Sequence, residues 1–182
     1  MKNRILPIAV VAFSIFGVCL CNAGWGQQKQ PISISGEGVK SRWVQQHIID
    51  VDDVPGHQIR NYEIQRTYSA DSGLVVDGEH IVESWTRGFS NYTNGIGPAW
   101  SYTTWITEKG NKIFIESAGT SDTKPTETGS KRGTYHGTSR LISGTGRFAK
   151  VRGLLVDMAK FDTDPKTAYN VLETHGEYWF EQ

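Results

Sequence analysis

The feature that most constrains the fold of this 182-residue chain is the absence of a helical repeat. No window of a dozen residues places apolar side chains at a period of 3.6, so no layer of amphipathic helices is expected. Runs rich in Val, Ile, Thr, Tyr, Phe and Trp alternate instead with clusters of Gly, Asp, Asn and Pro, which is the pattern of strands separated by turns. The predicted strands are Trp43–Val51, His57–Tyr68, His80–Phe89, Ala99–Thr107, Lys112–Ala118, Arg132–Ile142, Leu154–Phe161 and Ala168–Phe180.

Short connections between these runs indicate antiparallel neighbours, since a parallel crossover would need a dozen or more residues. Gly110-Asn111, for example, lies between two strong runs and suits a tight hairpin. Eight meandering strands without helices form a closed barrel or a two-sheet sandwich. Several runs carry apolar side chains on both faces, which favours a barrel with a partly polar lumen and an outer wall that packs against other subunits. We therefore predict one all-β domain, an eight-stranded antiparallel β-barrel, over residues 41–182.

The N-terminal segment predicts export. Lys2 and Arg4 precede an apolar run that ends near Ala23, as in a signal peptide, so we expect residues 1–23 to be removed. An uncleaved anchor is the alternative. Residues 24–40 are expected to form a flexible lead-in, with room for a short edge strand. The protein would then be secreted or periplasmic, with no membrane contact after cleavage.

The mature chain would contain no cysteine, because Cys19 and Cys21 both lie in the predicted signal peptide. Disulfides, catalytic thiolates and thiolate metal sites are thereby excluded. Loss of the two basic residues leaves a slightly acidic chain, which argues against nucleic acid or anionic membrane as a partner.

The segment SGTGRFAKVRG, residues 143–153, has the glycine spacing of a dinucleotide-binding turn. Such a turn needs a following helix whose N-terminus holds the phosphates. A new apolar run begins directly after Gly153, which leaves no room for that helix. We interpret the segment as a strand-to-strand corner, in which Gly144 and Gly146 take positive φ and Phe148 closes one end of the barrel.

This corner segment also resembles the GTGRF-type segment that joins two late strands in the allene oxide cyclase and dirigent β-barrel superfamily. DVPGHQI, GIGPAWSYTTW and EKGNKIF, in that order, are similar to segments of bacterial relatives, so that the resemblance covers most of residues 41–182. It implies a calycin-like, allene oxide cyclase-like barrel that is often trimeric. Its members include cyclases of isomerase type, dirigent proteins that steer phenoxy radical coupling, and bacterial proteins without assigned activity, none of which needs a metal or redox cofactor. The plant cyclase's pocket glutamate, asparagine and cysteine have no aligned counterpart in this sequence.

Aromatic side chains with interspersed charges suggest a ligand site in the lumen. Such rings line an apolar pocket, while a carboxylate and a guanidinium fix the polar end of a ligand. A glutamate in the middle of a strand could act there as a general acid or base. The predicted ligand-binding residues are Tyr62, Trp85, Arg87, Trp100 and Tyr102, and the predicted catalytic residues are Glu63 and Glu83. Ordinary barrel packing with subunit contact is the alternative interpretation.

Glu173, His175 and Glu177 project to one face of the last predicted strand. A carboxylate–imidazole–carboxylate row can bind a divalent metal or relay a proton. We favour a solvated strand face instead, and we predict no metal site.

The function that these observations favour is the binding of a small apolar or amphipathic molecule in the lumen of a homo-oligomeric barrel, which the resemblance implies to be a trimer. One alternative is a cyclase or isomerase that works without a cofactor in the same pocket. A second alternative is a structural barrel that acts through its outer face. Hydrolase and kinase motifs are absent from the sequence.

Overall fold

The computed structural model describes residues 27–37, 39–69, 74–127, 129–162 and 170–182, and the predicted signal peptide lies outside these ranges. The described residues form strands, joined by turns, and one short 3-10 helix. These elements are β1 (Gln30–Glu37), β2 (Lys40–Asp50), β3 (His57–Thr67), β4 (Val75–Val76), β5 (Glu79–Thr93), β6 (Ile96–Thr107), β7 (Lys112–Pro125), β8 (Lys131–Gly144), η2 (Gly146–Phe148), β9 (Val151–Asp162) and β10 (Asn170–Phe180). No helix within the described ranges is long and apolar enough to span a membrane.

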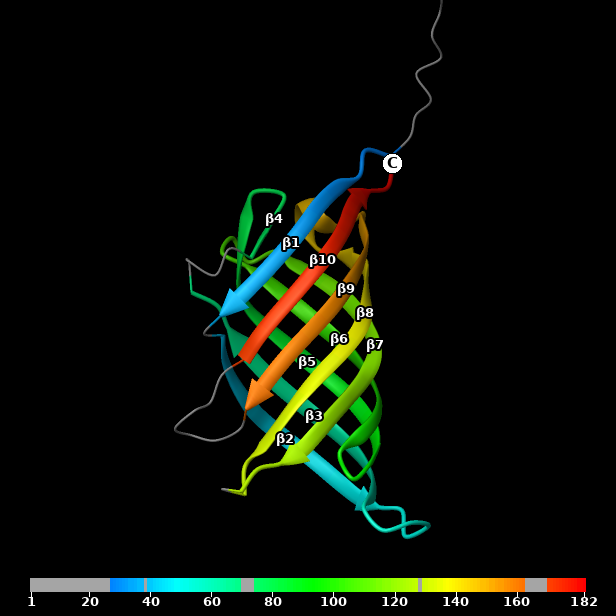
Figure 1. The fold of residues 1–182 in the computed structure, drawn as a ribbon. Helices are drawn as coiled ribbons and strands as arrows, with labels where there is room; N and C mark the ends of the chain where they lie inside the picture. The colour runs from blue at the N-terminus through cyan, green and yellow to red at the C-terminus, as the bar shows by residue number, and fades with distance from the viewer. Residues whose placement is uncertain (1–26, 38, 70–73, 128, 163–169) are drawn as a thin grey trace, which may run out of the picture.

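The strands form one antiparallel sheet with the order β1-β10-β9-β8-β7-β6-β5-β3-β2, and β4 pairs with β5 off this path. All eight predicted runs overlap strands, with Ala168 and Tyr169 of the last run outside the described residues, and the prediction of an all-β antiparallel fold is confirmed. β1 adds a further strand within the predicted lead-in, paired with β10. Figure 1 shows the sheet coiled on itself, so that β2, β3 and β5 lie behind β8, β9 and β10. β1 and β2 are the two ends of the hydrogen-bonded path, and closure into a barrel stays a prediction.

Side chains alternate between two faces of this sheet, as the pleat of a strand requires. The inner face carries the most buried positions, among them Ile64, Thr86, Ser139 and Leu155. We call the opposite side the outer face. It carries the neighbouring residues of each strand, such as Leu154, which is exposed.

The inner face divides into two halves of different character. One half is an apolar core, in which side chains of β1, β4, β5, β6, β7, β8, β9 and β10 pack around η2. Its largest fully buried side chain is Phe148, which is 0% exposed and lies 6.2 Å from the Phe180 ring between centroids. The predicted corner with Phe148 at one end of the sheet is therefore confirmed.

The corner is built by a single left-handed glycine. Gly146 opens η2 with a φ of 56°, and β9 begins at Val151, so there is no helix that could hold a dinucleotide. The expected positive φ at Gly144 is wrong: this residue ends β8, and a Cβ there would come within 2.8 Å of the Phe148 Cβ. Gly144 is thus required by close packing and not by its backbone angle.

Candidate functional site

The predicted lumen residues lie mostly on the outer face. Tyr102 is 62% exposed and Trp100 is 48% exposed, on a strand whose inner positions include the buried Trp105. Glu83, Trp85 and Arg87 alternate with the buried Ser84 and Thr86 and therefore point away from the inner face. Among the predicted ligand-binding residues, only Tyr62 shares a face with Ile64 and Thr86.

The two predicted catalytic carboxylates are engaged on this outer face. Glu63 forms an ion pair with Arg87 at 2.7 Å and accepts a hydrogen bond from Gln45 at 3.2 Å. Glu83 accepts hydrogen bonds from the Gln65 amide at 2.5 Å and from the Trp85 indole at 2.8 Å. Each carboxylate is held by neighbours on adjacent strands or on its own strand, as in ordinary cross-strand pairing.

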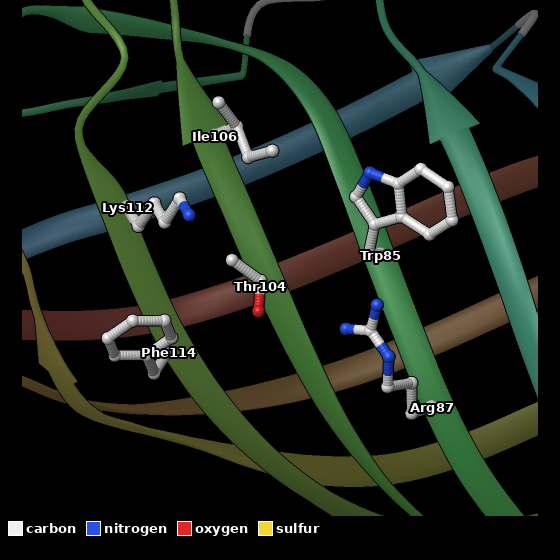
Figure 2. A pocket seen from close by; sticks show the side chains of 6 residues that line it. All are labelled: Trp85, Arg87, Thr104, Ile106, Lys112 and Phe114. Carbon is white, nitrogen blue, oxygen red and sulfur yellow. The ribbon is translucent and has the colours of Figure 1, made fainter.

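A shallow groove of 280 Å³ crosses β5, β6 and β7 on the outer face. Figure 2 shows the side chains of three neighbouring strands that line it. The lining residues are Trp85, Arg87, Thr104, Ile106, Lys112 and Phe114. Arg87 is already paired with Glu63, and its guanidinium lies 5.7 Å from the Trp85 ring centre, so this cation of the groove lining is engaged by protein groups.

The second half of the inner face is polar and centres on Asp157 of β9. Thr174 donates a hydrogen bond to the Asp157 carboxylate at 2.7 Å, and Ser139 donates another. The Ser117 and Ser139 hydroxyls lie 2.6 Å apart, so that the chain of hydrogen bonds continues from β9 to β7. Burial raises the pKa of Asp157 above its ordinary value, and the two hydroxyl donors offset only part of this effect.

Three tyrosines share this polar half with Asp157. Burial raises the pKa of Tyr135, and the charges of Asp157, Tyr62 and Tyr92 raise it further, so these groups lie within electrostatic reach of one another. Tyr92 also donates a hydrogen bond to Ser121 at 2.9 Å. The inner face therefore brings together a carboxyl group and three phenols from β3, β5, β8 and β9.

Glycines hold two of these rings in place. A Cβ at Gly88 would overlap the ring of Tyr62, its register partner on β3. A Cβ at Gly119 or Gly137 would come within 2.6 Å of the Tyr135 ring carbon Cζ. Each ring lies against backbone that has no side chain, a contact that only glycine permits. Both tyrosines are thereby kept against the wall of the sheet.

Solvent reaches this half of the inner face. Tyr62, Tyr92, Tyr135 and Asp157 are all half-buried, whereas the inner side chains of the apolar core are exposed by 8% or less. These side chains are thus accessible to a small molecule as well as to water. The polar half is therefore the best-placed candidate site among the described residues.

Two of the three residues in the row on β10, His175 and Glu177, have local partners. The Ser33 hydroxyl of β1 lies 2.9 Å from His175 Nδ1, and Lys29 forms an ion pair with Glu177. Within the described part of the chain, no three His, Cys, Asp or Glu side chains gather closely enough to hold a metal ion.

Comparison with known proteins shows a likeness in fold. No family model matches the sequence, and a search of curated proteins finds no significant match. The structure is similar to that of the pterocarpan synthase dirigent protein GePTS1. The similarity covers 99% of this chain and 98% of that chain, with a TM-score of 0.42 and 12% sequence identity. It concerns the fold alone.

Sequence reasoning missed Asp157, Tyr92 and Tyr135, although a signal was present. Tyr135 lies between Gly133 and Gly137 on one face of β8, and a large ring flanked by two empty positions indicates a packed inner face. Asp157 interrupts an inner row that Leu155 and Phe161 would otherwise make apolar. A lone carboxylate in a buried row is the pattern of a functional group.

The raised pKa of Asp157 predicts a pH-dependent effect of Asp157→Asn. Because the folded state holds this proton more tightly, it binds more protons than the unfolded state once the pH exceeds the ordinary value of 3.8. The contribution of Asp157 to stability therefore falls as pH rises from there through the raised pKa, and the variant does not titrate. Urea unfolding of the wild type and the variant between about pH 4 and pH 8 measures this effect. We expect the free energy of unfolding of the variant to rise relative to that of the wild type as pH rises. A difference that is independent of pH, or shifts the other way, would contradict this assignment.

Proposed function

We propose that the protein binds a small, partly apolar molecule against the polar half of its inner face. The observation that carries this proposal is the solvent contact of Tyr62, Tyr92, Tyr135 and Asp157 on an interior-facing surface. Aromatic rings offer apolar area at a low cost in conformational entropy, and a few placed polar groups fix orientation.

A purely structural interior gives a poor account of these residues. Withdrawing a carboxyl group and phenols from water costs free energy unless they are fully hydrogen-bonded, and an apolar filling avoids that cost. The same chain fills the other half of the inner face with Ile, Leu, Val and Phe side chains. The polar half therefore departs from the filling that stability alone would favour, and ligand binding gives a reason for the departure.

A cofactor-independent cyclase or isomerase is the alternative, and the pKa of Asp157 favours it. A carboxyl group with a raised pKa keeps its proton to a higher pH and can donate it to a reacting group as a general acid. This residue would take the role that the sequence assigned to Glu63 and Glu83. The discriminating result is a substrate that the protein converts and that Asp157→Asn still binds but no longer converts.

Fluorescence titration with N-phenyl-1-naphthylamine, a neutral aromatic probe, tests the binding proposal. We expect saturable binding that Tyr135→Leu weakens about tenfold, since one ring of the site and its contacts are lost. Tyr102→Leu removes a tyrosine from the outer face and is expected to leave the affinity unchanged. The proposal fails if the probe does not bind, or if Tyr102→Leu weakens binding and Tyr135→Leu does not.

Export and self-association stay predictions from the sequence. We propose a secreted or periplasmic location on the basis of the N-terminal segment alone. We also propose a homo-oligomer, for which the exposed Leu154 and Val156 on the outer face of β9 offer apolar contact area.

A further inference from the structure

A second polar group on the inner face lies next to the tyrosines. Arg60 of β3 and Ser90 of β5 are register partners, two residues along each strand from Tyr62 and Gly88. Arg60 Nε and Ser90 Oγ are both withdrawn from solvent, and neither has a hydrogen-bond partner in the described part of the chain. Ser90 is 0% exposed. Buried donors without partners are rare because each loses its hydration without compensation.

Arg60 is surrounded by aromatic rings. Its guanidinium carbon lies 4.9 Å from the Trp43 ring centre, 5.3 Å from that of Tyr62 and 5.6 Å from that of Tyr92. Ring faces attract the cation but do not replace a hydrogen-bond acceptor at Nε. Arg60 therefore brings a positive charge and an unsatisfied donor to the inner face.

Two other arginines beside the inner face and the groove have polar partners. Arg66 donates to the Thr86 hydroxyl at 3.0 Å on the inner face, and Arg87 is paired with Glu63 on the outer face. Arg60 has no such ion pair among the described residues. The lack of a partner is thus specific to the position that faces Ser90.

We propose that Arg60 and Ser90 bind the carboxylate of an amphipathic ligand whose apolar part lies against Tyr62 and Tyr92. A carboxylate only accepts hydrogen bonds, and it satisfies both a guanidinium N–H and a hydroxyl at once. Its single charge balances that of one guanidinium. This inference rests on the proposed function, because it defines one end of the molecule that the inner face binds.

Displacement of N-phenyl-1-naphthylamine by two competitors tests the inference. 4-Phenylbutyrate and its methyl ester share their apolar part and differ in the charge at one end. We expect the acid to displace the probe at about tenfold lower concentration than the ester, since a hydrogen bond to a charged group is stronger than one to a neutral group. Arg60→Gln should remove this preference, which is measured as the ratio of the two displacing concentrations within that variant.

Two further variants separate a binding role from a structural one. Arg140→Gln makes the same change on the outer face, where Arg140 pairs with Glu116, and should keep the preference for the acid. Ser90→Ala should reduce the preference several-fold and leave the melting temperature of the free protein unchanged or higher, because it removes an unsatisfied hydroxyl. A serine with a structural role would lower the melting temperature on substitution.

The possible failures are distinguishable. If the neutral probe does not bind, the proposed function fails and the carboxylate site fails with it. If the probe binds but acid and ester compete equally, or Arg60→Gln keeps the preference, the carboxylate site is wrong and the proposed function stands. Competition by acetate or inorganic phosphate as strong as that by 4-phenylbutyrate would contradict an amphipathic ligand.

Discussion

Phe148→Ala is expected to lower the free energy of unfolding by about 3–5 kcal/mol. Phe148 is 0% exposed and packs beside Phe180 at the centre of the apolar core. Truncation removes the transfer free energy of the ring and leaves a cavity among side chains of several strands, which cannot all collapse into it. Urea unfolding of the variant and the wild type, monitored by tryptophan fluorescence, measures the loss.

Phe114→Ala is the matched control. Phe114 lies half-buried on the outer face of β7, at the groove, so the same truncation removes a ring that already contacts water. We expect less than half of the loss at Phe148. Equal losses at the two positions would contradict the placement of Phe148 as the plug of one end of the sheet.

Ala159→Trp is expected to abolish binding of the neutral naphthylamine probe, with a loss of at least about 100-fold, or nearly 3 kcal/mol. Ala159 is the register partner of Tyr135 and lies two residues from Asp157 on the inner row of β9. An indole at this position would occupy the space that the ligand needs. Fluorescence titration with that probe measures the loss, and a thermal melt verifies that the variant is folded.

Lys160→Trp supplies the control for this substitution. Lys160 is exposed on the outer face of the same strand, so the added indole should change neither folding nor binding. If the polar half of the interior were filled, Ala159→Trp would instead unfold the protein through overpacking. If Ala159→Trp does unfold the protein, the smaller substitution Ala159→Phe decides between the two explanations. Loss of folding in Ala159→Phe as well would contradict the proposed ligand site.

The strands could be predicted from the sequence because their signals are local. The β-branched and aromatic runs and the Gly-Asn turn at residues 110–111 each act within a few residues, and the predicted corner at Phe148 follows from the short distance to the next run. The sequence indicates β1 only weakly, because its apolar and polar residues alternate over a few positions and its stability comes from pairing with β10 at the far end of the chain.

The candidate site could not be predicted in the same way, because alternation along a strand does not tell which of its two faces is inner. Trp85, Arg87 and Tyr102 were assigned to the lumen for their chemistry, and the sheet turns them outward. Which face of a strand is the inner one depends on how it pairs with other strands. Tyr62 of β3, for example, packs over Gly88 of β5 on the inner face. The neighbours that raise the pKa of Tyr135 likewise come from three other strands.

A crystal structure of the protein grown with N-phenyl-1-naphthylamine is the most direct test of the central claim that the inner face is a ligand site. We predict that the probe lies on the inner face, with its rings within about 4 Å of Tyr135 and Asp157. A probe seated in the outer groove against Trp85, with the interior filled by the protein's own side chains, would contradict the account.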